Sequence, residues 1–231
     1  NWTLIFLFQG GFAVLCFFAV WRGLGETLPQ GKRVASGFVS VLYAYLALMR
    51  DRQYVAFTLA NAAISGSMFA YITGSSFVFI SYHQLSPEYF AVIFGVNALG
   101  FIIGAQVNAW LLRTYEGRLI LGVGTSVHLV ASMVLLGLSL LAPHLMLPLA
   151  ATFFVLLGCG GFIGANAVAA AMSRARDNVG AAAALNGVVQ FGAAACAGAL
   201  VGLLNDGTAL PMASVIAALS IAGTVARLAA R

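Results

Sequence analysis

Charged residues are scarce in this sequence of 231 residues. Asp, Glu, Lys and Arg together make up 7% of it, whereas a soluble globular domain carries about 25%. Hydrophobic residues make up 62%, so a water-soluble fold would lack the polar surface needed to cover its core. This deficit excludes a soluble protein. It predicts an all-α polytopic membrane protein, whose surface is covered by lipid and whose helices satisfy their own backbone hydrogen bonds.

Residues that carry chemistry are also few. Cys16, Cys159 and Cys196 stand in apolar segments, with no CxxC pair and no His at ligand spacing, so we expect three small core residues. The apolar segments contain no carboxylate pair and no phosphate-binding loop. The net charge of +5 comes from basic residues that stand singly or in pairs, without interleaved aromatic residues. We therefore expect no enzymatic activity, no metal, no cofactor and no nucleic-acid partner.

Long uncharged segments are abundant. A helix needs about 20 apolar residues to cross about 30 Å of hydrocarbon. Seven segments of this size contain no acidic or basic residue: 2–21, 54–80, 89–112, 119–141, 145–172, 180–203 and 208–226. One charge near the bilayer centre costs about 3 kcal/mol or more, so these segments predict seven membrane-spanning helices.

Basic residues occur in every second connection between these segments. Five lie between Arg22 and Arg52, two from Arg113 to Arg118, two from Arg174 to Arg176, and two after residue 226. All eleven basic residues thus fall on one side of the membrane, which the positive-inside rule assigns to the cytoplasm. We expect residue 1 outside and residue 231 in the cytoplasm. A chain that begins outside without a signal sequence also leads us to expect preceding spans in the same protein.

The predicted organisation has three parts. Residues 1–22 form one span, residues 23–53 a cytoplasmic linker, and residues 54–231 a six-helix transmembrane domain. The linker contains apolar residues at spacings of three and four, namely Phe38, Val41, Leu42, Tyr45, Leu46 and Met49. This spacing predicts an amphipathic helix, which lies either in the membrane interface or against the cytoplasmic face of the protein.

Polar residues within the spans need a partner or contact with water. In the second span, one helical stripe comprises Asn61, Ser65, Met68, Ile72, Ser75 and Phe79, with Phe69 and Tyr71 near its edges. Amides on other spans are Asn97, Asn166, Asn186 and Gln190. Each amide alone is explained by an interhelical hydrogen bond or by ligand contact. As a group they predict an internal cavity for a small amphipathic organic molecule, with Asn61, Met68, Phe69, Tyr71, Asn97, Asn166, Asn186 and Gln190 as candidate binding residues.

Other features of the spans allow a structural interpretation. The glycine pairs Gly100/Gly104, Gly160/Gly164 and Gly198/Gly202 predict close helix packing. His128, alone in the fourth span, is either a protonation site or a packing residue. Ser86, Pro87 and Glu88 form the pattern of a helix start, with an N-cap, a proline at the first helical position and an acid in the first turn.

Several strings resemble the Bcr/CflA drug-resistance family of the major facilitator superfamily. Glu26-Thr27-Leu28-Pro29 resembles the signature after that family's sixth helix, and Phe69-Ala70-Tyr71 with Ser75-Ser76-Phe77-Val78 resembles its seventh helix. The string NAWLLRTYEGR at 108–118 is similar to the link between helices eight and nine. Gly164-Ala165-Asn166-Ala167 and GAAAALNGVVQ at 180–190 resemble helices ten and eleven, although family members often have Pro at the position of Ala165.

The resemblance covers the whole chain and implies the sixth to twelfth helices of a twelve-helix transporter. It implies proton-driven export of drugs or other small amphipathic compounds from a bacterial inner membrane, by alternating access and without a cofactor. The partner of this chain is then the missing N-terminal half, which holds the proton-coupling acids. Arg113, Glu116 and Arg118 become a cytoplasmic gate latch, unless they only set the topology. An importer of a small metabolite and a non-transporting membrane or assembly protein remain the alternatives.

Overall fold

A computed structural model describes residues 2–25, 38–175 and 179–230. Within these residues the chain forms helices and no strands, and seven of the helices are long and apolar enough to cross a membrane. The predicted all-α polytopic fold and its seven spans are therefore confirmed. Residues 1, 26–37, 176–178 and 231 lie outside the described part of the chain. The string at 26–29 is among them.

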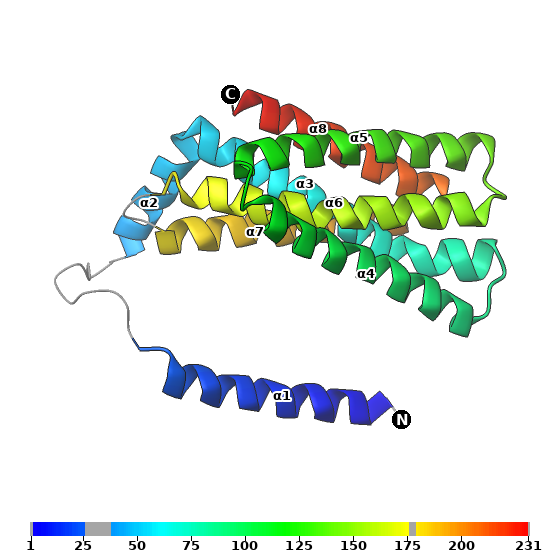
Figure 1. The fold of residues 1–231 in the computed structure, drawn as a ribbon, viewed down its shortest axis with the longest axis horizontal. Coiled ribbons are helices and arrows are strands. Elements are labelled where there is room, and N and C mark those ends of the chain that lie inside the picture. Colours follow the sequence, from blue (N-terminus) through cyan, green and yellow to red (C-terminus); the bar gives the residue numbers. More distant parts are fainter. Residues whose placement is uncertain (1, 26–37, 176–178, 231) are drawn as a thin grey trace. The chain divides into compact units, whose positions relative to one another are not determined.

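From α2 onward the helices follow one another with short connections (Figure 1). The helices are α1 (Trp2–Gly23), α2 (Phe38–Arg50), α3 (Arg52–Ser76), α4 (Pro87–Leu111), α5 (Gly117–Leu141), α6 (Met146–Met172), α7 (Val179–Leu203) and α8 (Leu210–Ala229). A π-helix, Phe77–Tyr82, extends α3. Helix α4 begins with Pro87 after the N-cap residue Ser86, as the sequence predicts.

The chain divides into two compact units, residues 1–40 and 41–231. The first contains α1, whose described side chains are exposed and overwhelmingly apolar. The second contains nearly all of α2 and the bundle of α3 to α8. The division falls inside the segment 23–53 that the sequence predicts as a linker.

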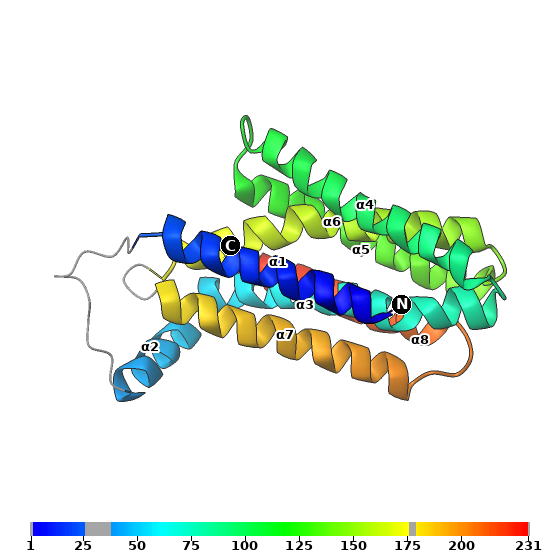
Figure 2. The ribbon, with the colours of Figure 1, turned by 90° about the horizontal axis from the view of Figure 1, so that it is seen from below.

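Helix α3 is the centre of the bundle. It packs against α6, α7 and α8, while α4 packs on α6 and α5 packs on both α6 and α8. Figure 2 shows α4, α5 and α6 on one side of this unit and α3, α7 and α8 on the other. The contact between α3 and α6 joins the two groups. Because α3 has neighbours on most of its faces, its polar residues Thr58, Asn61, Ser67 and Ser75 are buried inside the protein, whereas Thr73 and Ser76 are exposed.

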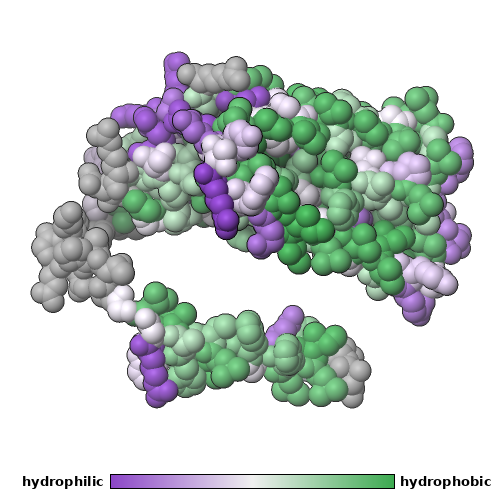
Figure 3. Space-filling view, in the orientation of Figure 1, coloured by the Kyte–Doolittle hydropathy of each residue, from purple (hydrophilic) through white to green (hydrophobic). Residues whose placement is uncertain are grey.

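The described arginines of the second unit gather at one end of the bundle, which we call the basic end. They are Arg50, Arg52, Arg113, Arg118, Arg174 and Arg227. Each stands at the end of α2, α4, α6 or α8, or at the start of α3 or α5, and these termini meet because the helices alternate in direction (Figure 1). Figure 3 shows hydrophobic side chains over the middle of the bundle and hydrophilic ones toward its ends. This distribution suits a surface surrounded by lipid.

Glycines bring α4 and α6 into close contact. A Cβ on Gly104 would collide with the carbonyl oxygen of Gly158, and one on Gly100 would lie 2.8 Å from the carbonyl oxygen of Phe154. On the α6 side, a Cβ on Gly161 would lie 2.5 Å from the backbone nitrogen of Ala105. Only glycine allows two backbones to approach so closely. The Gly100/Gly104 pair therefore packs as predicted.

The other predicted glycine pairs behave differently. The α6 glycines that meet the backbone of α4 are Gly158 and Gly161, whereas a Cβ on Gly164 would have only Asn61 Oδ1, at 3.8 Å, near it. Gly198 lies against Thr73, with 3.0 Å between its added Cβ and Oγ1, but Gly202 has open space. The spacing of four residues thus identifies the glycines of α4 that contact the α6 backbone, but it identifies the wrong pair on α6. The α6 residues at the crossing with α4 are Gly158 and Gly161, about one turn apart.

Helix α2 buries one edge and exposes the other. Leu48 is buried against the bundle, with Val41 and Tyr45 partly buried beside it. Leu42, Leu46 and Met49, which also belong to the predicted apolar stripe, are exposed. The side chain of Phe38 lies outside the described residues. The helix thus packs on the protein and still presents apolar side chains at the basic end.

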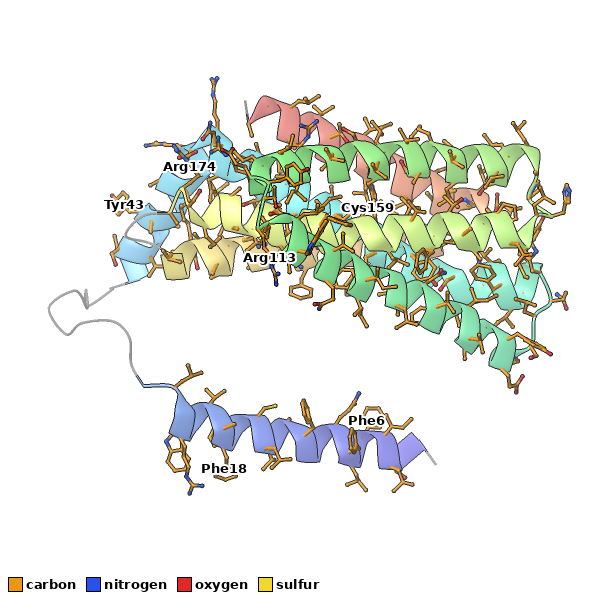
Figure 4. All side chains as sticks on the ribbon, viewed as in Figure 1. Phe6, Phe18, Tyr43, Arg113, Cys159 and Arg174 are labelled. Atoms are coloured by element: carbon orange, nitrogen blue, oxygen red, sulfur yellow. The ribbon has the colours of Figure 1, made fainter. Side chains whose placement is uncertain are left out.

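The three cysteines differ in their burial. Cys159 is buried in the bundle (Figure 4), as the sequence predicts. Cys16 and Cys196 are exposed, so the expectation that all three are core residues is wrong for these two. A thiol is apolar enough to face lipid as readily as a core.

Asp51 begins α3 and connects it to the end of α6. Its carboxylate accepts hydrogen bonds from the backbone N–H groups of Gln53 and Tyr54, at 2.9 and 3.0 Å. The guanidinium of Arg174 donates to the same carboxylate from Nε and Nη2, at 3.1 and 2.9 Å. The hydrogen bond from Tyr54 N–H, with further contributions from Arg174, lowers the pKa of Asp51 below its usual value. Asp51 therefore acts as a charged N-cap.

We expect the substitution Asp51→Ala to lower the free energy of unfolding by about 1 kcal/mol at neutral pH, since it removes the N-cap. The folded pKa of Asp51 lies below its unfolded value, so its contribution is fully present above the unfolded pKa and is lost as the pH falls through the folded pKa. Thermal unfolding in detergent at a series of pH values measures this. The wild-type and D51A curves should converge at acid pH.

The matched control is Arg174→Gln, which removes the exposed ion pair and leaves the cap. It should cost less than about 1 kcal/mol. A loss in R174Q equal to that in D51A would contradict the assignment of the main effect to the cap.

Candidate functional site

A cavity of about 450 Å³ lies among the six helices of the bundle. Every helix from α3 to α8 contributes to its wall. The lining residues are Asn61, Ile64, Ser65, Ser67, Met68, Tyr71, Phe101, Ala105, His128, Phe153, Leu156, Leu157, Gly160, Gly161, Gly164, Ala165, Val168, Gln190 and Ile216. Its volume falls within the range of about 300–1,000 Å³ that is usual for sites that bind small organic molecules.

The wall of this cavity is mostly apolar and aromatic, with a few neutral polar groups. Those groups are the side chains of Asn61, Ser65, Ser67, Tyr71, His128 and Gln190. Among the described residues, no Asp, Glu, Lys or Arg lines it. Such a wall offers apolar contact area together with hydrogen-bonding groups that orient a ligand.

Three predicted amides meet at the α3–α7 side of the cavity. Asn61 Nδ2 donates to Gln190 Oε1 at 3.1 Å, and it lies 3.5 Å from Asn186 Oδ1. Asn61 and Gln190 line the cavity, whereas Asn186 is buried outside the lining. All three residues of this cluster are among the candidate binding residues that the sequence predicts. Two of them line the cavity, and Asn186 contacts Asn61 from outside the lining.

Tyr71 carries a hydroxyl group in the cavity wall. It accepts a hydrogen bond of 3.0 Å from Asn97 Nδ2, and its ring packs against Phe94 and Phe153 with centroids 5.6 and 4.9 Å away. Asn97 is buried and does not line the cavity. Because a phenol both accepts and donates, the Tyr71 hydroxyl that accepts from Asn97 keeps its own proton as a hydrogen-bond donor. Asn97 thus holds the Tyr71 hydroxyl from outside the cavity lining.

The predicted stripe on α3 follows the cavity only in its first part. Ser65 and Met68 line the cavity, whereas Ser75 and Phe79 are buried beyond it and Ile72 is exposed. Phe69 also lies outside the lining, where its ring packs edge-to-face against Phe191 of α7 with centroids 6.5 Å apart.

Asn166 has interhelical partners at the α4–α6 contact. Its Nδ2 donates to Asn108 Oδ1 at 2.6 Å and to the carbonyl oxygen of Phe162 at 2.7 Å. A Cβ on Gly117 would lie 2.7 Å from Asn166 Oδ1, so the start of α5 also lies against this amide. Asn166 does not line the cavity. Of the two roles that the sequence leaves open, this geometry is the interhelical one.

His128 lines the cavity, although the sequence alone leaves its role open. It is buried, and its Nδ1 lies 2.8 Å from Ser220 Oγ of α8, with the direction of the hydrogen bond set by the tautomer. The aromatic residues Phe101 and Phe153 are further lining residues that sequence reasoning misses. The sequence does not distinguish these two residues as cavity residues, because α4 and α6 consist mostly of apolar residues.

The three predicted latch residues lie at or next to the α4–α5 turn, at the basic end and outside the cavity lining. Figure 4 labels Arg113 among them. Arg113, Glu116 and Arg118 are all exposed. Glu116 is the N-cap residue of α5, without a hydrogen bond from its side chain to the cap. The guanidinium carbon of Arg118 lies 5.7 Å from the centre of the Phe57 ring, a cation–π distance. The structure thus places these residues together on one surface and connects Arg118 to α3.

The fold and the cavity define a polytopic α-helical membrane protein with a small-molecule-sized cavity between its helices. The chain belongs to the Major Facilitator Superfamily, whose family model matches residues 1–199. It is similar to the "Uncharacterized MFS-type transporter YdgK" of Bacillus subtilis (strain 168), with 27% identity over 228 residues. That alignment covers 98% of this chain and 56% of the relative.

A second similar protein is the "Bicyclomycin resistance protein homolog" of Haemophilus influenzae (strain ATCC 51907 / DSM 11121 / KW20 / Rd). It is 24% identical over 212 residues, which cover 92% of this chain and 53% of that protein. The chain therefore spans about half the length of the curated relatives it matches. The superfamily suggested by the sequence strings is confirmed.

Proposed function

We propose that this chain is part of a proton-driven exporter of drugs or other small amphipathic compounds, of the Bcr/CflA type. The cavity of about 450 Å³ is the observation that carries the proposal. Its aromatic and aliphatic walls favour the apolar part of a ligand, and Asn61, Tyr71 and Gln190 provide neutral hydrogen-bonding groups.

The absence of charge from the described lining supports this substrate class over charged metabolites. A site for a phosphate or carboxylate compound gains its selectivity from Arg or Lys, because an unpaired ligand charge is costly to bury. An amphipathic compound requires no such partner. The name of the Haemophilus influenzae relative, a homolog of a bicyclomycin resistance protein, points to the same class.

The proposed orientation places the basic end in the cytoplasm of a bacterial inner membrane, with residue 1 outside and residue 231 inside. Arg113, Glu116 and Arg118 then lie on the cytoplasmic surface, where a latch between the two halves of a transporter would act. The remaining helices of the transporter, including those with the proton-coupling acids, belong to an N-terminal half that completes the cavity for alternating access.

The proposal is tested by expressing the full-length gene in a bacterium whose own efflux pumps are deleted. We expect cells to accumulate less of a fluorescent amphipathic dye than cells with an empty vector. A protonophore should remove the difference, since it abolishes the driving force. Unchanged accumulation across a panel of such dyes would sink the exporter assignment, and increased accumulation would favour the importer.

A further inference from the structure

A second cavity, of about 690 Å³, lies at the basic end and is separate from the candidate substrate cavity. It is bordered by α3, α5 and α8 and shares no lining residue with the first. Two of its lining residues are arginines from different helices, Arg118 at the start of α5 and Arg227 near the end of α8. Among the described residues, no carboxylate lines it. The two guanidinium groups therefore contribute positive charge to the described part of its wall.

Both arginines lie close to the helices that border this cavity. The guanidinium of Arg118 lies over the Phe57 ring, 5.7 Å from its centre. Arg227 Nη1 lies close to α5, because a Cβ added to Gly122 would be only 3.3 Å from it. The lack of a side chain at Gly122 thus makes room for the second guanidinium. Two planar donors at one site match the oxygens of a phosphate group.

The helix that carries Arg118 continues as an apolar surface. Leu119, Val123 and Val127 line the cavity and are 56%, 57% and 43% exposed. The same three residues border another cavity, of about 440 Å³, on the other side of α5, where Cys159 and Phe162 contribute to an apolar wall. In a membrane, these exposed side chains contact acyl chains. The arginines therefore stand at the end of a surface that already accommodates hydrocarbon.

We propose that Arg118 and Arg227 bind the phosphate of an anionic phospholipid, with its acyl chains along Leu119, Val123 and Val127 of α5. A basic pocket between transmembrane helices, at the end where the positive-inside rule places anionic headgroups, has the chemistry for this ligand. A free phosphate compound would use the two guanidiniums but not the apolar surface. The assignment is independent of the transported substrate.

Phospholipid binding is measured on the purified full-length protein in detergent by native mass spectrometry and by thermal unfolding. Dioleoyl-phosphatidylglycerol should be retained and should raise the melting temperature more than dioleoyl-phosphatidylcholine. The double variant R118Q/R227Q should bind phosphatidylglycerol about tenfold more weakly, because hydrogen bonds from charged groups are lost. Arg50→Gln, which neutralises an exposed arginine at the same end outside the cavity, should bind as the wild type does.

A second variant separates binding from folding. Ser126 is an exposed lining residue, and Ser126→Phe fills the cavity while both arginines remain. It should lose the preference for phosphatidylglycerol and keep the melting temperature of the lipid-free protein. Wild-type affinity in both R118Q/R227Q and S126F would overturn the proposal. Equal stabilisation by glycerol 3-phosphate, which lacks acyl chains, would also overturn it, by showing a simple anion site.

Discussion

Replacing Gly104 by Ala is expected to remove most of the folded protein. The added Cβ would collide with the carbonyl oxygen of Gly158, and no flexible side chain stands between the two helices to move aside. Overpacking in a protein interior costs about 1–3 kcal/mol even where side chains can adjust. Because two backbones must separate here, we expect a loss above that range, against a total stability of about 5–15 kcal/mol. The yield of monodisperse protein in detergent and its melting temperature measure the effect.

Gly95→Ala is the matched control on the same helix. A Cβ on Gly95 has nothing within 4 Å, so it causes no collision. Alanine is favoured over glycine in a helix by about 1 kcal/mol, so G95A should be as stable as the wild type or more so. A G104A protein with the yield and melting temperature of G95A would show that α4 and α6 do not cross at Gly104 and Gly158.

The substitution Gly164→Trp is expected to abolish transport while leaving the protein folded. Gly164 lines the candidate substrate cavity, and the nearest atom to its added Cβ is Asn61 Oδ1 at 3.8 Å, which is an ordinary contact. The indole can therefore occupy space that a ligand would need. We expect dye export by the full-length protein to fall by about tenfold or more, which corresponds to about 1.4 kcal/mol or more of lost binding free energy.

Gly137→Trp provides the control for this result. Gly137 lies on α5, has nothing within 4 Å of its added Cβ, and does not line the cavity. Both variants should appear in the membrane at the wild-type level, and only G164W should lose export. If G164W exports as fast as G137W, the cavity of about 450 Å³ is not the path of the substrate.

The spans are the part of the fold that the sequence predicts well. When the π-helix is counted with α3, the predicted segments and the observed helices differ by no more than three residues at either end. The reason is that a charge in hydrocarbon is costly wherever it faces, so the boundaries of each uncharged segment follow from composition alone. The same rule places Arg50, Arg118 and Arg174 at one end of the bundle without knowledge of helix packing.

The role of each polar residue is harder to predict. Asn61 and Asn166 look alike in the sequence, as single amides in apolar helices, yet Asn61 lines the cavity and Asn166 bonds to Asn108. An amide needs a partner in lipid, but its position along a helix does not identify that partner. Asn97 shows this most clearly, because its partner Tyr71 lies on a different helix, 26 residues away in the sequence.

The apolar residues of the cavity wall are even harder to predict from the sequence. In a soluble protein, alternation of polar and apolar residues separates surface from core, but in a membrane both faces of a helix are apolar. Phe101 and Phe153 line the cavity, whereas Phe191, on a helix of similar composition, is exposed. Arg227 and Gly122 likewise come together only because α8 packs against α5.

The sequence by itself thus determined the class of protein, the seven spans, and the end of the bundle at which its described arginines gather, because each depends on the cost of transferring single residues from water to lipid. The tertiary structure decided which glycines form the α4–α6 crossing, which amides face the cavity and which position another side chain. It also brought Arg118 and Arg227 to one cavity. These features depend on the rotation and register of each helix against its neighbours, which close packing sets and transfer energies leave undetermined.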